Sequence, residues 1–228
     1  MNRLLTPLCR RLYLLLAVVL GLDGGFYLVR HSGWYKERLY RQLIAGDRQH
    51  KVSAAADLLD TGGQAQLVRA LRSDSASARE LAANALWELW FHAAGDEAYR
   101  FVAAAQRLID RHDFADALLL LNHVVKAYPG FAEGWNRRAT LYWLMGDYRK
   151  SIADCRRVLG LNPSHFGAWQ GMGLCQLEIG DVRGACRSLR AACQITPYDL
   201  GARQLLQRCE EMLRQNPARG SPRGSELI

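Results

Sequence analysis

The chain has 228 residues, half of them hydrophobic, and a formal net charge of +8 at pH 7. This length allows one or two domains with a buried core, and this hydrophobic content excludes a wholly disordered chain. The net charge is uneven, at +6 over residues 1–51, −4 over 52–97, +4 over 98–199 and +2 beyond. A basic bias near the N-terminus favours an anionic membrane surface over nucleic acid as a partner.

The N-terminus combines basic residues with an apolar run. Arginines precede an uncharged stretch from Leu12 to Leu22, and the apolar character continues past Asp23 to Val29. A helix of this length is near the short limit for crossing a bilayer, and an acidic residue toward one end can reach water. We therefore expect residues 1–33 to form a basic region and an uncleaved, single-pass membrane anchor.

Two alternatives to the anchor remain open. A cleaved signal peptide would leave a secreted or periplasmic protein, although no A-x-A cleavage site follows the run. The same stretch could also be a buried or surface helix. Basic residues lie on both sides of the run, so the positive-inside rule gives no orientation.

Residues 34–97 contain a short repeat. The stretch 44–59 aligns with 71–86 after a shift of 27 residues, and both stretches end in an alanine-rich segment. Each copy is typical of a helix, an Asp-containing turn and a second helix, and Thr61-Gly62-Gly63 supplies turn residues between the copies. The pattern resembles a short HEAT-type repeat, which implies a HEAT-like helical pair over 34–97.

A period of 34 residues runs through residues 98–199. Bulky residues, two rows of small residues, a row of β-branched or small residues, and prolines all recur at this spacing. In that order they are Phe101, Trp135 and Trp169; Ala105, Ala139 and Gly173; Ala117, Ser151 and Ala185; Val124, Val158 and Ala192; Pro129, Pro163 and Pro197. Antiparallel helices pack closely only where one offers a side chain small enough to admit the other, so each period predicts a helical hairpin.

This order of bulky, small, small and proline positions resembles the tetratricopeptide repeat, a helix–turn–helix unit. The resemblance implies an all-α fold, a right-handed α-solenoid. Its three implied units are 98–131, 132–165 and 166–199. Arg138, His112 and Gln176 stand where leucine, glycine and tyrosine are usual, and packing is expected to be looser there.

The C-terminal part predicts one further helix and a tail. Apolar residues recur at helical spacing from Leu200 to Leu213. Since the open end of a solenoid needs a helix with one polar face, we expect a capping helix over 200–215, which completes a repeat domain over 98–215. Residues 216–228 are rich in Pro, Gly and Ser and are expected to be a disordered tail.

The sequence carries no recognised signature of catalysis or metal binding. The chain has no H-E-x-x-H, G-x-S-x-G, Walker or G-x-G-x-x-G motif, and its six cysteines show no C-x-x-C spacing. The histidines are scattered, and His123 and His165 are expected to be solvated or helix-capping. We therefore predict a non-catalytic protein with no catalytic residues, no metal site and no cofactor.

In tetratricopeptide proteins the first helix of each unit lines a concave groove that takes peptides. Carried onto this chain, the resemblance gives the predicted partner-binding residues Gln106, Asn136, Arg137, Thr140, Trp143, Gln170 and Leu174. Trp143 is the predicted anchor, because the packing pattern does not require a tryptophan there. The alternative is that Trp143 packs on a neighbouring loop.

Some members of this family clamp the C-terminal carboxylate of chaperones with Lys, Arg and Asn side chains. At the matching positions this chain has Val102, Gln106, Arg137, Gly167 and Gly171. The clamp is therefore absent, and a chaperone C-terminus is not the expected partner.

Five arginines on the predicted second helices form a basic convex stripe: Arg149, Arg156, Arg183, Arg187 and Arg190. Exposed charge is ordinarily just a solvated face, and the alternative is contact with anionic lipid or, less favoured, nucleic acid. Overall we expect a scaffold that binds a partner protein or peptide in the concave groove, at a membrane. A module that binds anionic surfaces and an accessory subunit of an enzyme complex are the alternatives.

Overall fold

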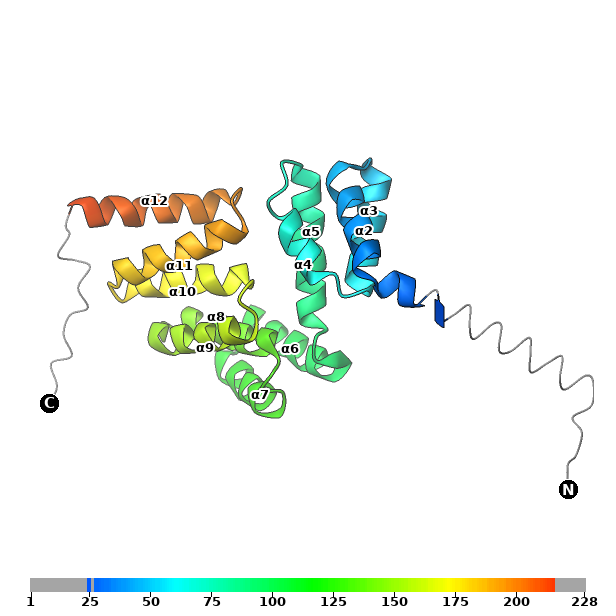
Figure 1. Cartoon of the computed structure of the whole chain (residues 1–228). Coiled ribbons are helices and arrows are strands. Elements are labelled where there is room, and N and C mark those ends of the chain that lie inside the picture. The colour runs from blue at the N-terminus through cyan, green and yellow to red at the C-terminus, as the bar shows by residue number, and fades with distance from the viewer. Residues whose placement is uncertain (1–23, 26, 216–228) are drawn as a thin grey trace, which may run out of the picture.

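The computed structural model describes residues 24–25 and 27–215, and this part of the chain is helical throughout, without strands. Successive helices are joined by short turns (Figure 1). They are α2 (Gly33–Ala45), α3 (Arg48–Asp60), α4 (Gln64–Ala70), α5 (Ala76–Phe91), α6 (Gly95–Asp110), α7 (Phe114–Ala127), α8 (Ala132–Leu144), α9 (Tyr148–Leu161), α10 (Phe166–Glu178), α11 (Val182–Ile195) and α12 (Leu200–Gln215).

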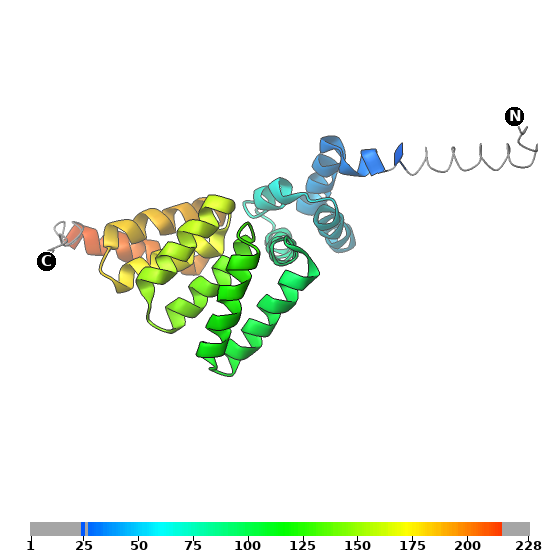
Figure 2. The same ribbon diagram turned by 90° about the horizontal axis from the view of Figure 1, so that it is seen from below.

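Helices α6 to α12 stack side by side into a solenoid, and α2 to α5 form a separate cluster beside it (Figures 1 and 2). Within the solenoid each helix packs chiefly on its neighbours in the chain. Stacking of this kind is how repeat proteins bury apolar faces that no single repeat can bury alone. The expected all-α solenoid is confirmed.

Small residues allow the helices of each pair to approach. Ala105, Ala117, Ala139 and Ala185 are at most 2% exposed. At Gly173 a Cβ atom would lie only 2.8 Å from Cγ of Leu189, so α10 and α11 could not keep this separation with a larger residue.

The turn inside each pair needs one residue in the left-handed region. Gly146 and Gly180 have φ values of 79° and 78°, and His112 occupies the equivalent turn with φ 64°. Glycine adopts this conformation without a steric penalty, whereas a residue with a Cβ does so at a cost. The turn at His112 is therefore locally strained, whereas the turns at Gly146 and Gly180 are not.

Two other departures from the family pattern are compensated by polar contacts. Arg138 donates from Nε and Nη2 to the two carboxylate oxygens of Asp154, at 2.7 and 2.9 Å, and its pKa is raised by these hydrogen bonds. The side-chain amide of buried Gln176 lies 2.7 Å from Oγ of Ser188. Hydrogen-bonded partners thus replace apolar packing at both positions.

Helices α2 to α5 share an apolar core that includes Leu43, Leu58, Leu67 and Leu86, all at 0% exposure. The helices form two pairs, but α4 has only seven residues where α2 has 13. The similarity to HEAT repeats stays a prediction.

The predicted single-pass membrane anchor is wrong as a description of this structure. Among residues 24–25 and 27–215, no helix is long and apolar enough to cross a membrane. Helix α2, which follows the predicted anchor, has 13 residues, or about 20 Å of helix, and carries Lys36, Arg38 and Arg41. The apolar run from Leu12 to Leu22 and the predicted tail over 216–228 lie outside the described residues.

Candidate functional site

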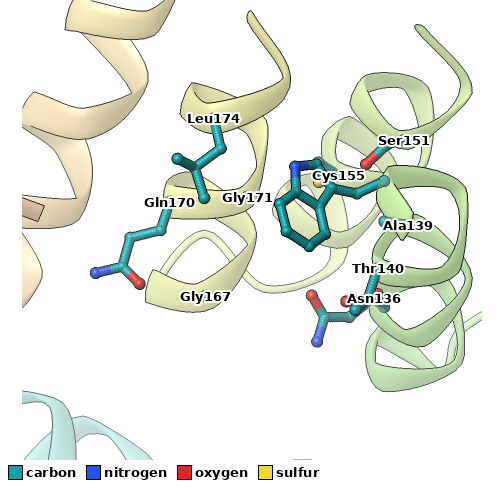
Figure 3. A pocket seen from close by; sticks show the side chains of 10 residues that line it. Asn136, Ala139, Thr140, Ser151, Cys155, Gly167, Gln170, Gly171 and Leu174 are labelled. Atoms are coloured by element: carbon teal, nitrogen blue, oxygen red, sulfur yellow. The ribbon is translucent and has the colours of Figure 1, made fainter. Parts of the chain in front are cut away.

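A pocket of about 220 Å³ opens between α8 and α10, the first helices of two successive pairs (Figure 3). Its lining is uncharged and mostly apolar. The lining residues are Asn136, Ala139, Thr140 and Trp143 of α8, Ser151 and Cys155 of α9, and Gly167, Gln170, Gly171 and Leu174 of α10.

Helical spacing explains which side chains reach the pocket. Asn136, Thr140 and Trp143 stand at i, i+4 and i+7, so they share one face of α8. The facing stripe of α10 has two glycines, and a Cβ at Gly171 would lie 3.8 Å from Sγ of Cys155. Because Gly167 and Gly171 have no side chains, a hollow remains between the helices, and Ser151 and Cys155 of α9 form its floor.

Trp143 is 41% exposed although it lines the pocket. A tryptophan is more often largely buried, and one that stays exposed beside an apolar hollow is typical of a contact site.

A buried polar network lies behind the pocket wall. Glu133 is fully buried, and its carboxylate accepts hydrogen bonds from Nε of Arg137 at 2.7 Å and from Nδ2 of Asn136 at 3.2 Å. Nε2 of His165 lies 3.1 Å from the same carboxylate, while Nδ1 of His165 accepts from the backbone N–H of Ala168. Because Nδ1 is an acceptor, Nε2 carries the proton and donates to Glu133. Asn136 is thereby held in place at the pocket wall.

Arg137 belongs to this network and does not line the pocket. Besides Glu133, its guanidinium contacts Oε1 of Gln106 at 3.2 Å and lies 4.7 Å from the ring centroid of Phe91. Gln106 in turn donates to Asp110 at 2.8 Å. The structure thus brings five of the seven predicted groove residues around one pocket, and places Arg137 and Gln106 outside it, in contact with each other.

The thiol of Cys155, which lines the pocket, has low reactivity at neutral pH. Burial raises the pKa of Cys155 to about 12, so the thiol is protonated at neutral pH, and the thiolate is the reactive form. In the described part of the chain, no group of His, Cys, Asp and Glu residues is arranged to hold a metal ion.

The five arginines of the convex stripe are all exposed. Arg183, Arg187 and Arg190 line a second hollow between α11 and α12, where Arg190 pairs with Glu210 at 2.7 Å. Arg149 and Arg156 lie on α9, one helix pair earlier.

Sequence reasoning missed the contact between α5 and the repeats. Trp90 stacks on the ring of His165 with centroids 4.5 Å apart, and Trp87 meets Phe166 edge to face at 5.3 Å. Residues this far apart in the chain carry no shared periodicity that could have revealed the contact. The sequence predicts that His165 is solvated or caps a helix, and in the structure it caps α10.

Comparison with known proteins agrees with the repeat fold. The family model of the tetratricopeptide repeat matches residues 132–165. A TPR repeat-containing protein of Rhizobium etli is 35% identical over 112 residues, which cover 49% of this chain and 55% of that protein. A Protein SGT1 homolog of Bos taurus is 29% identical over 119 residues, covering 48% and 35%. The chain therefore spans about half or less of the length of these relatives.

Solved structures show the same architecture. The Sgt2 TPR domain from Aspergillus fumigatus superposes with a TM-score of 0.51 at 16% identity, covering 58% of this chain and 89% of that one. The first TPR of Spaghetti (RPAP3), bound to an HSP90 peptide, has a TM-score of 0.50 at 16% identity, covering 51% and 93%. With the helix pairs of 34-residue period described above, these matches show that the chain contains tetratricopeptide repeats.

Proposed function

We propose that residues 98–215, as three repeat units over 98–131, 132–165 and 166–199 with a capping helix over 200–215, form a non-catalytic scaffold. It binds a partner protein by taking a segment of that protein into the pocket between α8 and α10. The observation that carries this proposal is the exposed Trp143 beside an uncharged, mostly apolar hollow. An exposed aromatic next to a preformed hollow is the usual form of an interface anchor site.

The chemistry of the lining suits a particular kind of segment. The hollow has no charged residue, so it favours a bulky, uncharged, apolar side chain over an ionised one. Asn136, Thr140 and Gln170 supply amide and hydroxyl groups that can hydrogen-bond the backbone of an extended segment. We therefore propose an extended peptide segment with one apolar anchor residue.

A chaperone C-terminus is a poorer match for this groove, although a similar structure is bound to an HSP90 peptide. Gly167 and Gly171 offer no side-chain charge to a carboxylate, and Arg137 is already paired with Glu133 at 2.7 Å. A carboxylate entering this pocket would find no free cation among the residues that line it.

The experiment is an affinity purification with the full chain and a Trp143→Ala variant that keeps the wild-type circular dichroism spectrum. The matched control is Trp34→Ala, because Trp34 is 68% exposed and lies on α2, away from the pocket. We expect a partner retained by the wild type and by the control to be lost with Trp143→Ala. Equal retention by all three proteins contradicts the proposal.

A second candidate rests on the hollow between α11 and α12, where Arg183, Arg187 and Arg190 outnumber the single carboxylate of Glu210. We propose contact with an anionic surface as its function. Binding to acidic liposomes or to an oligonucleotide should then weaken steeply as salt rises, because binding releases counterions. A flat salt response removes this candidate.

A further inference from the structure

The groove of the repeats has one edge covered by the chain itself. Helix α5 lies beside one end of the repeat helices (Figures 1 and 2). Trp87, Trp90 and Phe91 of α5 contact the N-terminal parts of α8 and α10, through Arg137 and through His165 and Phe166. The coverage thus falls at the ends where α8 and α10 begin.

The residue Asp74 before α5 and the first turn of α5 extend this contact toward α12. Oη of Tyr198, in the turn before α12, donates to Asp74 at 2.5 Å, and the guanidinium of Arg79 lies 4.1 Å from the centroid of the Tyr198 ring. The starts of α8, α10 and α12 therefore all lie against the same N-terminal unit.

Gly167 connects this contact to the pocket. It lines the pocket, and a Cβ atom placed on it would lie 2.9 Å from Cη2 of Trp87. The indole of Trp87 thus lies directly against a wall residue of the pocket. Because residue 167 is a glycine, no side chain lies between the Trp87 indole and the backbone of α10 at this point.

The opposite ends of α8 and α10 carry exposed apolar side chains. Trp143, Leu144 and Met145, at the end of α8, are 41–42% exposed, and Ile179 at the end of α10 is 42% exposed. Of these four residues, Trp143 lines the pocket.

We infer that Trp87 is a specificity-determining residue that closes one edge of the groove, so that the pocket accepts a segment only from the Trp143 edge. The occupant is an extended peptide segment whose apolar anchor residue lies near the point where its chain ends or turns away. This inference rests on the proposed function, and it adds a limit on length and direction that the repeats alone do not impose. A segment that continued past Gly167 would have to displace the Trp87 indole.

The test uses a peptide selected against the full chain from a random peptide library. The peptide is lengthened by several residues at one end or at the other, and the dissociation constants are compared. For the wild type, we expect extension at one end to be tolerated and extension at the other to weaken binding by about tenfold or more. For Trp87→Ala, we expect both extensions to be tolerated. Trp87→Phe, which keeps a ring at this position, should retain most of the penalty, and Trp34→Ala should behave as the wild type.

Equal tolerance of both extensions by the wild type overturns the inference, and so does an undiminished penalty in a folded Trp87→Ala variant. If Trp87→Ala does not fold, Trp87→Leu takes its place, and the wild-type comparison already decides the first point. Failure of the proposed function gives a different result, because the unextended peptide would then bind Trp143→Ala as tightly as the wild type.

Discussion

The carboxylate of Glu133 should be the most sensitive polar group of the repeat array. It is fully buried and serves three neighbours: Arg137 at 2.7 Å, Asn136 at 3.2 Å and His165 at 3.1 Å. Glu133→Ala leaves the half-buried guanidinium of Arg137 without its carboxylate and removes an acceptor from two buried side chains. Breaking a buried ion pair from one side costs about 3–5 kcal/mol, because the remaining charge stays desolvated. We expect a loss of that size in the free energy of unfolding.

Urea denaturation followed by circular dichroism measures this loss. Glu133→Gln keeps a side-chain oxygen acceptor and should lose less than Glu133→Ala, while the double variant with Arg137→Leu should recover part of the loss, since no unpaired charge remains. Glu88→Ala is the matched control, because the carboxylate of Glu88 lies on the surface, 3.6 Å from Nε2 of His92. A loss below about 1 kcal/mol in Glu133→Ala would refute the reasoning that this network is essential to the fold.

Three further predictions concern the turns, the packing and the thiol. His112→Gly should raise the free energy of unfolding by up to about 1 kcal/mol, because it relieves the left-handed strain, and Gly146→Ala should lower it by about 1 kcal/mol. A change of the same sign in the free energy of unfolding of both variants would contradict this account. Gly173→Val should cost about 1–3 kcal/mol in urea denaturation, because its Cβ falls 2.8 Å from Leu189, and an unchanged midpoint would show that α10 and α11 can separate freely. Burial raises the pKa of Cys155 to about 12, so this thiol should resist alkylation by iodoacetamide at pH 8 until urea unfolds the chain. Peptide mapping by mass spectrometry measures the alkylation. Rapid modification of the native protein would count against a buried, protonated thiol.

The repeats could be predicted because their signal is local and recurs. Each small residue, turn and proline keeps its place in a 34-residue period, and the second and third predicted units begin at Ala132 and Phe166, where α8 and α10 begin. The positions facing the pocket followed from the same register. Their role as binding residues stays a prediction.

The roles of Arg137 and Trp87 could not be predicted from the sequence. Arg137 occupies a groove position in the repeat pattern, but its charge is used by Glu133 and Phe91, the latter on a helix outside the repeats. Trp87 contacts His165 and Phe166 across a long separation in the chain. Such contacts depend on how α5 docks in three dimensions, and neither helical periodicity nor composition encodes that docking.

The most direct test of the central claim is the affinity of a purified partner segment for the full chain and for Trp143→Ala, measured by titration calorimetry. If Trp143 anchors the partner beside the pocket, Trp143→Ala should reduce the binding free energy by about 2 kcal/mol or more, which makes the dissociation constant about 30-fold larger. Trp34→Ala, at an exposed residue, should bind as the wild type does. Equal affinities for wild type and Trp143→Ala, with both proteins folded, would contradict binding in the groove between α8 and α10.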